Sequence, residues 1–155
     1  MVSPSPRVGV DIWADISCPW CYIGRRKFEI GLAAFAHAEV VEVTQRSYVL
    51  NPDAPLNFEG SSREFLVQHK GIPADRIDQM AVQVRRGAEE VGLVYDTENL
   101  KVTNTSKAHQ VLHLAKKDGL QLELVDRFFT ALFAEGRHLG SCHVRAPGWL
   151  GACAR

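Results

Sequence analysis

The stretch Cys18-Pro19-Trp20-Cys21 decides the fold. Residues 8–16, which precede it, alternate between apolar and polar side chains with the two-residue period of a β-strand. Pro19 suits the first position of a helix, where its missing N–H is no loss. Apolar residues then recur at mostly helical spacing to about residue 36. The stretch therefore predicts a strand, a turn that carries two cysteines, and a helix.

A second strand is predicted over residues 39–49, which are rich in β-branched and aromatic side chains. A strand, a helix and a strand of this length form a parallel βαβ unit with a right-handed crossover. We expect this unit over residues 7–50, and the Asn-Pro-Asp-Ala-Pro breaker at residues 51–55 ends it. The predicted fold class is α/β.

Helical patterns fill residues 60–136 and predict a helical subdomain inserted behind the βαβ unit. The expected helices begin at Ser61 or Ser62, at Pro73, at residues 103–106 and at about Leu122, and they end at Gly71, Gly92, Gly119 and Gly136. Residues 141–155 have no period and are expected to be an atypical tail. The 155 residues are expected to form one domain.

The composition argues against several kinds of partner. Eighteen basic and eighteen acidic residues cancel, so the chain has no global field for nucleic acid or an anionic membrane. The sequence lacks a run of about 18 apolar residues, which a membrane helix would need. Residues 1–7 lack the apolar segment of a signal peptide. We therefore expect a cytoplasmic protein with neither nucleic acid nor membrane as a partner.

Cys18 and Cys21 are the candidate catalytic residues. In the cytoplasm a Cys-x-x-Cys pair is more often redox-active or metal-binding than a permanent disulfide. The thiolate is the attacking species, and the unpaired N–H groups and dipole at a helix start stabilise it. We assign Cys18 as the nucleophile and Cys21 as the resolving cysteine. A buried structural pair and half of a metal site are the alternatives.

No metal site is predicted. Cys142 and Cys153 lack the close spacing of a zinc knuckle, and we assign them no role, although both could mispair with the first two cysteines under oxidation. His109 and His113 are four residues apart, but neither a Glu in an H-E-x-x-H pattern nor a third ligand accompanies them. A solvated or capping role is expected for His109.

Side chains near the cysteines have more than one interpretation. Trp13, Trp20 and Tyr22 could line a hydrophobic substrate groove, and Trp13 could equally belong to the sheet-face core. Arg25 and Arg26 could add positive potential near the cysteines, but the helical period favours a solvated face for both.

The stretch Asp-Ile-Ser-Cys-Pro-Trp-Cys-Tyr-Ile-Gly at residues 15–24 resembles the DsbA-like thioredoxin family of the FrnE type. Residues 48–52, 87–92 and 104–109 support the resemblance, which spans roughly residues 7–140. The resemblance implies a thioredoxin-like fold with a helical insertion. It implies a dithiol oxidoreductase that acts on protein or small-molecule thiols and disulfides. No cofactor is implied besides the redox-active disulfide, with glutathione as a further option.

Substrate-binding residues are expected at Pro19, Trp20 and, by the same resemblance, Asn104. Pro19 and Trp20 lie between the cysteines, where they would contact substrate and set the stiffness and redox poise of the pair. Asn104 would help to shape the substrate cleft. An N-cap of the following helix is the favoured alternative for Asn104, since Asn is a strong capping residue.

Glutathione-dependent 2-hydroxychromene-2-carboxylate isomerases belong to the same superfamily and are the alternative enzymatic interpretation. They carry Ser where this chain has Cys18, which favours disulfide exchange over isomerisation. The family also continues past this length into a cis-proline loop, a hairpin and a last helix. We therefore expect a truncated chain in which the C-terminal part of the fold is missing. An exposed sheet edge would then favour a homo-oligomer or an inactive, self-associating fragment.

Overall fold

The computed structural model describes residues 7–56, 58–96 and 98–139 of the chain. It begins with β1 (Val8–Ala14), α1 (Pro19–Ala33), the short 3-10 helix η1 (Ala38–Val40) and β2 (Val41–Ser47). The two strands pair in parallel, in a register that runs from Val8 opposite Val41 to Ala14 opposite Ser47. This is the predicted strand, helix and parallel strand, with Pro19 as the first helical residue.

Four further helices follow β2. They are α2 (Ser62–Lys70), α3 (Ala74–Glu89), α4 (Ser106–Ala115) and α5 (Gln121–Phe133), and the 3-10 helix η2 (Lys116–Asp118) joins the last two. Ser61 and Glu64 form a reciprocal capping box at the start of α2. Gly71 ends the helix at φ 64°, a left-handed conformation that glycine adopts without steric strain. The predicted α/β fold class with a helical insertion is thus confirmed.

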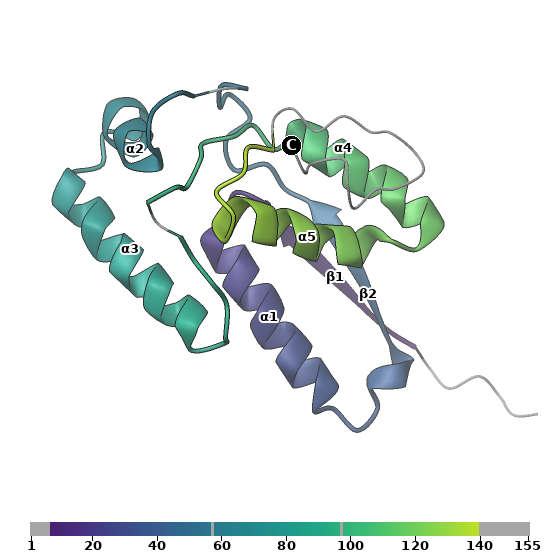
Figure 1. The fold of residues 1–155 in the computed structure, drawn as a ribbon. Helices are drawn as coiled ribbons and strands as arrows, with labels where there is room; N and C mark the ends of the chain where they lie inside the picture. Colours follow the sequence, from purple (N-terminus) through teal and green to yellow (C-terminus); the bar gives the residue numbers. More distant parts are fainter. Residues whose placement is uncertain (1–6, 57, 97, 140–155) are drawn as a thin grey trace, which may run out of the picture.

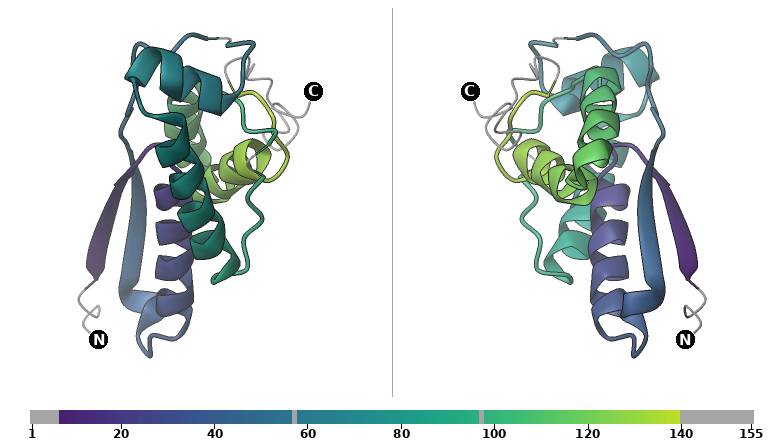
Figure 2. Two further views of the ribbon diagram at one scale, coloured as in Figure 1. Left: turned by 90° about the vertical axis from the view of Figure 1, so that its left-hand side faces the viewer. Right: turned by 90° about the vertical axis from the view of Figure 1, so that its right-hand side faces the viewer.

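The elements lie in layers. Figure 2 shows the two strands at one side of the molecule, α1 beside them, and α3 on the far side of α1. Figure 1 shows α5 crossing near the N-terminal end of α1, where the cysteines lie. The sheet has two strands within the described residues, and none of the described helices is long and apolar enough to cross a membrane.

The hydrophobic core is centred on α5. Phe128, Phe129 and Phe133 are each at most 1% exposed, and they pack with side chains from α1, α3 and α4. Tyr22 of α1 is 8% exposed, and its ring centroid lies 5.3 Å from that of Phe129 and 5.5 Å from that of Phe133. The prediction that Tyr22 lines a substrate groove is therefore wrong, because the neighbouring phenylalanines enclose its ring.

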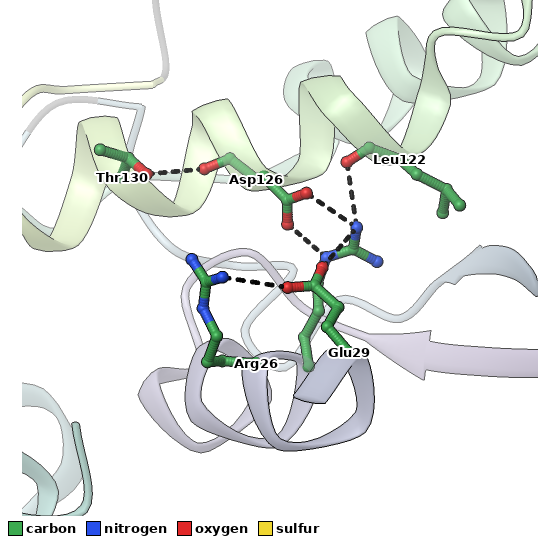
Figure 3. Close-up of polar contacts among 6 residues, drawn as sticks. Arg26, Glu29, Leu122, Asp126 and Thr130 are labelled. Carbon is green, nitrogen blue, oxygen red and sulfur yellow. Dashed lines mark hydrogen bonds and ion pairs between the residues drawn. The ribbon is translucent and has the colours of Figure 1, made fainter. Parts of the chain in front are cut away.

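The expectation for Arg25 is also wrong. Its side chain is only 7% exposed and pairs with Glu29 of α1 at 3.1 Å and with Asp126 of α5. One Arg25 nitrogen also donates to the Leu122 carbonyl at 3.1 Å. Figure 3 shows Asp126 and Leu122 facing the α1 helix, which carries Arg26 and Glu29. Arg26 keeps the predicted solvated position, with a side chain 46% exposed.

The sheet face that turns away from α1 is largely polar. Arg46 of β2 donates to the carboxylate of Asp11 on β1 at 2.8 Å, and Trp13 on the same strand is 63% exposed. Trp13 is therefore not part of a sheet-face core. The ion pair across the strands places charge on this face of the sheet.

Candidate active site

Cys18 lies at the junction between β1 and α1. It is the N-cap residue of α1, with extended backbone angles. Its N–H donates to the Asp15 carbonyl at 3.1 Å, and its own carbonyl accepts from the N–H groups of Cys21 and Tyr22 at 3.0 and 3.2 Å. These bonds form a tight turn that leads directly into the helix. Both Cys18 and Cys21 are free thiols of intermediate exposure.

The two thiols have opposite proton affinities. A hydrogen bond from the Cys21 thiol, assisted by the Cys21 and Trp20 backbone N–H groups, lowers the pKa of Cys18 to about 6. The same hydrogen bond, together with burial, strongly raises the pKa of Cys21. One proton thus stays on Cys21 while Cys18 is a thiolate. The charge on Cys18 is what a nucleophilic cysteine requires.

Pro19 and Trp20, predicted to bind substrate, follow Cys18 on the first turn of α1. Trp20 is 51% exposed. A Cβ atom at Gly87 of α3 would lie 3.3 Å from Cζ3 of the Trp20 indole and 3.4 Å from Cδ1 of Ile23. A glycine at this position therefore lets α3 approach the turn that carries the cysteines, and the outer side of the indole is left in solvent.

Asp15 is a buried carboxylate beside the cysteines, and sequence reasoning missed it. It is 1% exposed, and its two oxygens accept from the Ser17 N–H at 3.0 Å and the Leu50 N–H at 2.6 Å. Burial alone would raise its pKa, but the interactions with His109 and these amides outweigh burial and hold the pKa below its usual value. The position of Asp15 three residues before Cys18 was the available signal.

His109 faces this carboxylate. It is 4% exposed, so the expected solvated role is wrong. Its Nε2 lies 3.5 Å from Oδ1 of Asp15. His113 points elsewhere on α4, with Nε2 at 2.9 Å from the Ser47 hydroxyl. The two histidines therefore do not converge, and the described residues contain no group of three or more His, Cys, Asp or Glu arranged to hold a metal.

Asn104 connects two segments. Its Nδ2 donates to the carbonyls of Pro52 and Ala54 at 3.0 and 2.9 Å, and its Oδ1 accepts from the Ser106 N–H at 3.0 Å. The N-cap of α4 is Thr105. The predicted N-cap role of Asn104 is therefore wrong by one position, although Asn104 accepts the N–H of Ser106, the first residue of α4. It also holds the loop after β2 against the start of α4.

A cavity of about 240 Å³ borders the turn that leads to Cys18. It lies between the loop after β2, helix α2 and the segment before α4, and Ser17 contributes to its wall next to Cys18. Cys142 and Cys153 lie outside the described residues.

Comparison with known proteins agrees with this geometry. The DSBA-like thioredoxin domain family matches residues 9–146. A solved structure of a probable DsbA oxidoreductase from Streptomyces coelicolor is similar, with a TM-score of 0.78 and 35% sequence identity over 84% of this chain. This chain covers 56% of that protein. A search of curated proteins finds no match. With the family match covering most of its length, the chain belongs to the DsbA-like thioredoxin domain family.

Proposed function

We propose that the chain is a thiol–disulfide oxidoreductase in which Cys18 attacks and Cys21 resolves. The observation that carries the proposal is the Cys18 thiol at the start of α1, whose pKa is lowered to about 6 by the Cys21 thiol and by backbone N–H groups. At neutral pH such a thiol is largely ionised, and a thiolate whose pKa lies near ambient pH is an effective attacking group.

The reaction proceeds through a mixed disulfide. The Cys18 thiolate attacks one sulfur of a substrate disulfide, a Cys18–substrate S–S bond forms, and the other substrate sulfur leaves as a thiolate that takes a proton. Cys21 then loses its proton and attacks the Cys18 sulfur. The second substrate thiolate leaves and is protonated. Two electrons pass to the substrate, and Cys18 and Cys21 become a disulfide. The reverse sequence oxidises a dithiol.

The cysteine at position 18 supports disulfide exchange over the isomerase chemistry of the serine-bearing relatives, and the stretches at residues 15–24 and 104–109 support the FrnE type. The proposed substrates are protein or small-molecule thiols and disulfides, with Pro19 and Trp20 as the contact residues beside Cys18. The redox group is the cysteine pair itself. Glutathione is proposed as a small-molecule partner and the cytoplasm as the compartment.

Alkylation of Cys18 tests the proposal. The reduced protein is treated with iodoacetamide between pH 4 and pH 10, modified peptides are read by mass spectrometry, and folding is followed by circular dichroism. The folded protein should show an apparent pKa near 6 at Cys18. The same chain in urea is the matched control and should titrate near the free thiol value of about 8.5. Equal profiles in a folded sample would refute the proposal.

A trapping experiment tests the division of roles. With Cys21→Ser, a mixed disulfide between Cys18 and a substrate thiol should accumulate, because nothing resolves it. With Cys18→Ser, no such adduct should form at Cys21. The wild-type pair should equilibrate with glutathione at a potential between about −120 and −270 mV, the range of dithiol oxidoreductases. An adduct at Cys21 in preference to Cys18 would reverse the assignment.

A further inference from the structure

The carboxylate of Asp15 and the imidazole of His109 form a buried pair next to the cysteines. Asp15 is 1% exposed and His109 is 4% exposed. Oδ1 of Asp15 lies 3.5 Å from Nε2 of His109. Asp15 follows β1 and His109 lies on α4, so the pair joins the active-site turn to the helical insertion.

Asp15 holds the backbone of the turn in place. Its side chain accepts hydrogen bonds from the N–H of Ser17, just before Cys18, and from the N–H of Leu50, just after β2. Its own carbonyl accepts the Cys18 N–H at 3.1 Å. The carboxylate therefore orders the end of β1, the exit from β2 and the start of α1 together.

The charge of Asp15 acts against the cysteines. A buried carboxylate disfavours another negative charge nearby, and Asp15 raises the pKa of both Cys18 and Cys21 by Coulombic repulsion. The residue that orders the turn thus disfavours ionisation of the Cys18 thiol in that turn. A compensating positive charge on the far side of the carboxylate would remove this conflict.

His109 is placed to supply that charge. Its Nδ1 and Nε2 are buried, and neither makes a hydrogen bond within the described residues, while Nε2 faces the carboxylate. The imidazole of His109 is the titratable side chain that lowers the pKa of Asp15. The neutral hydroxyl of Thr105 also contacts it. His109 is therefore the basic side chain that faces Asp15 from α4.

We propose that His109 is a positioning residue for the redox pair: in its charged form it neutralises Asp15, so that Asp15 can order the turn without suppressing the Cys18 thiolate. This inference rests on the proposed function, because it concerns the reactivity of the same thiol. It assigns α4, which belongs to the helical insertion, a part in setting the chemistry at the start of α1.

Two substitutions should act in opposite directions. Removal of the cation in His109→Gln should slow Cys18 alkylation at pH 5, and removal of the anion in Asp15→Asn should accelerate it. We expect at least about threefold in each case, which corresponds to about half a pKa unit. His113→Gln is the matched control, since His113 lies on the same helix but contacts Ser47 instead, and it should leave the rate unchanged.

The double variant tests the coupling. The proposed effect of His109 passes through the Asp15 carboxylate, which is absent from Asp15→Asn. Adding His109→Gln to Asp15→Asn should then change the alkylation rate by less than about twofold. If both single variants shift the rate in the same direction, the pair has only a structural role and the inference is overturned.

A direct reading of His109 keeps the inference testable if the variants fold poorly. The imidazole Cε1–H resonance of the reduced wild-type protein should report a charged ring at pH 5 to 6, where Cys18 ionises. A neutral ring there overturns the inference. If wild-type Cys18 in a folded sample has the pKa of a free thiol, the proposed function is refuted. If its pKa is low but is unaffected by His109→Gln, only this inference is refuted.

Discussion

The guanidinium of Arg25 on α1 binds both carboxylate oxygens of Asp126 on α5, across 101 positions of sequence. Nη2 of Arg25 lies 2.9 Å from Oδ2 of Asp126, and the Arg25 side chain is only 7% exposed. A bidentate Arg–carboxylate pair is directional as well as attractive. It therefore fixes the helix that begins at the cysteines against the central helix of the core (Figure 3).

Breaking this pair should cost more than breaking an exposed one. Asp126→Ala leaves a buried guanidinium with Glu29 as its remaining carboxylate, and we expect a loss of about 1–2 kcal/mol in unfolding free energy. The estimate is modest because the Asp126 side chain is 48% exposed and partly screened. Urea denaturation followed by circular dichroism measures the loss.

Asp78→Ala is the matched control for this prediction. Two guanidinium nitrogens of Arg63 likewise donate to the Asp78 carboxylate, at 2.8 and 3.0 Å, but both side chains are more than half exposed. Surface pairs of this kind are screened by solvent and contribute little to the free energy of unfolding. If Asp78→Ala costs as much as Asp126→Ala, then burial of Arg25 adds nothing to its pair.

Local signals explain what could be predicted from sequence. The proline after Cys18, the Ser61 capping box and the glycine at position 71 each act within a few residues, so they can be read without the fold. The alternation in residues 8–16 likewise identified β1. These signals specify where elements begin and end, which was enough for the parallel βαβ unit and the thiols at the helix start.

Long-range contacts explain what could not be predicted. The helical period places Arg25 on a solvated face, and a solvated or capping role is expected for His109, yet each is buried and faces a carboxylate from a distant element. Tyr22 is predicted from its neighbours in sequence to line a groove. The ring that covers it belongs to α5, over a hundred positions away, and the local sequence does not reveal that contact. A buried charge depends on its partner, and no local pattern identifies that partner.

The reduced protein should become more stable as pH rises from about 6 to about 9. The pKa of Cys18 is lowered to about 6 in the fold, so between these values the unfolded chain binds more protons than the folded one, and stability rises with pH. The slope should stay below the one-proton limit of about 1.4 kcal/mol per pH unit. Cys21, whose pKa is raised, acts in the opposite sense and lowers stability above about pH 9.

Urea titrations at several pH values check this dependence. Cys18→Ala serves as the reference, because it removes the titrating thiol while the remaining ionisable groups stay. Subtracting its profile should leave a rise with pH. A flat difference between pH 6 and pH 9 would mean that Cys18 ionises no more easily in the folded protein than in the unfolded one.

Gly87→Ala should stabilise the protein less than an unhindered glycine substitution. Alanine in a helix interior gains about 0.5–1 kcal/mol over glycine, but at Gly87 the new Cβ would lie 3.3 Å from the Trp20 indole. Gly31→Ala on α1 is the control, because nothing lies within 4 Å of its Cβ position.

The fluorescence of Trp20 tests the same contact. With Trp13→Phe and Trp149→Phe in place to isolate its emission, the emission of Trp20 should shift only in Gly87→Ala. Equal stabilisation with unchanged emission would place the indole away from α3.

Tyr22→Ala should be among the most destabilising substitutions on α1. The ring stacks on Phe129 and Phe133 and is 8% exposed, so its removal leaves a cavity between α1 and α5. Truncating a buried aromatic residue costs about 3–5 kcal/mol. Phe35→Ala, just beyond the end of α1, is the control because that ring is 50% exposed, and a loss of about 1 kcal/mol or less is expected.

Tyr22→Ala should also change the Cys18 thiol. Since the cavity would open one residue after Cys21, Tyr22→Ala should move the Cys18 pKa toward the free thiol value, whereas Phe35→Ala should leave that pKa unchanged. Similar losses from both substitutions would show that the helix start does not depend on α5 for its position.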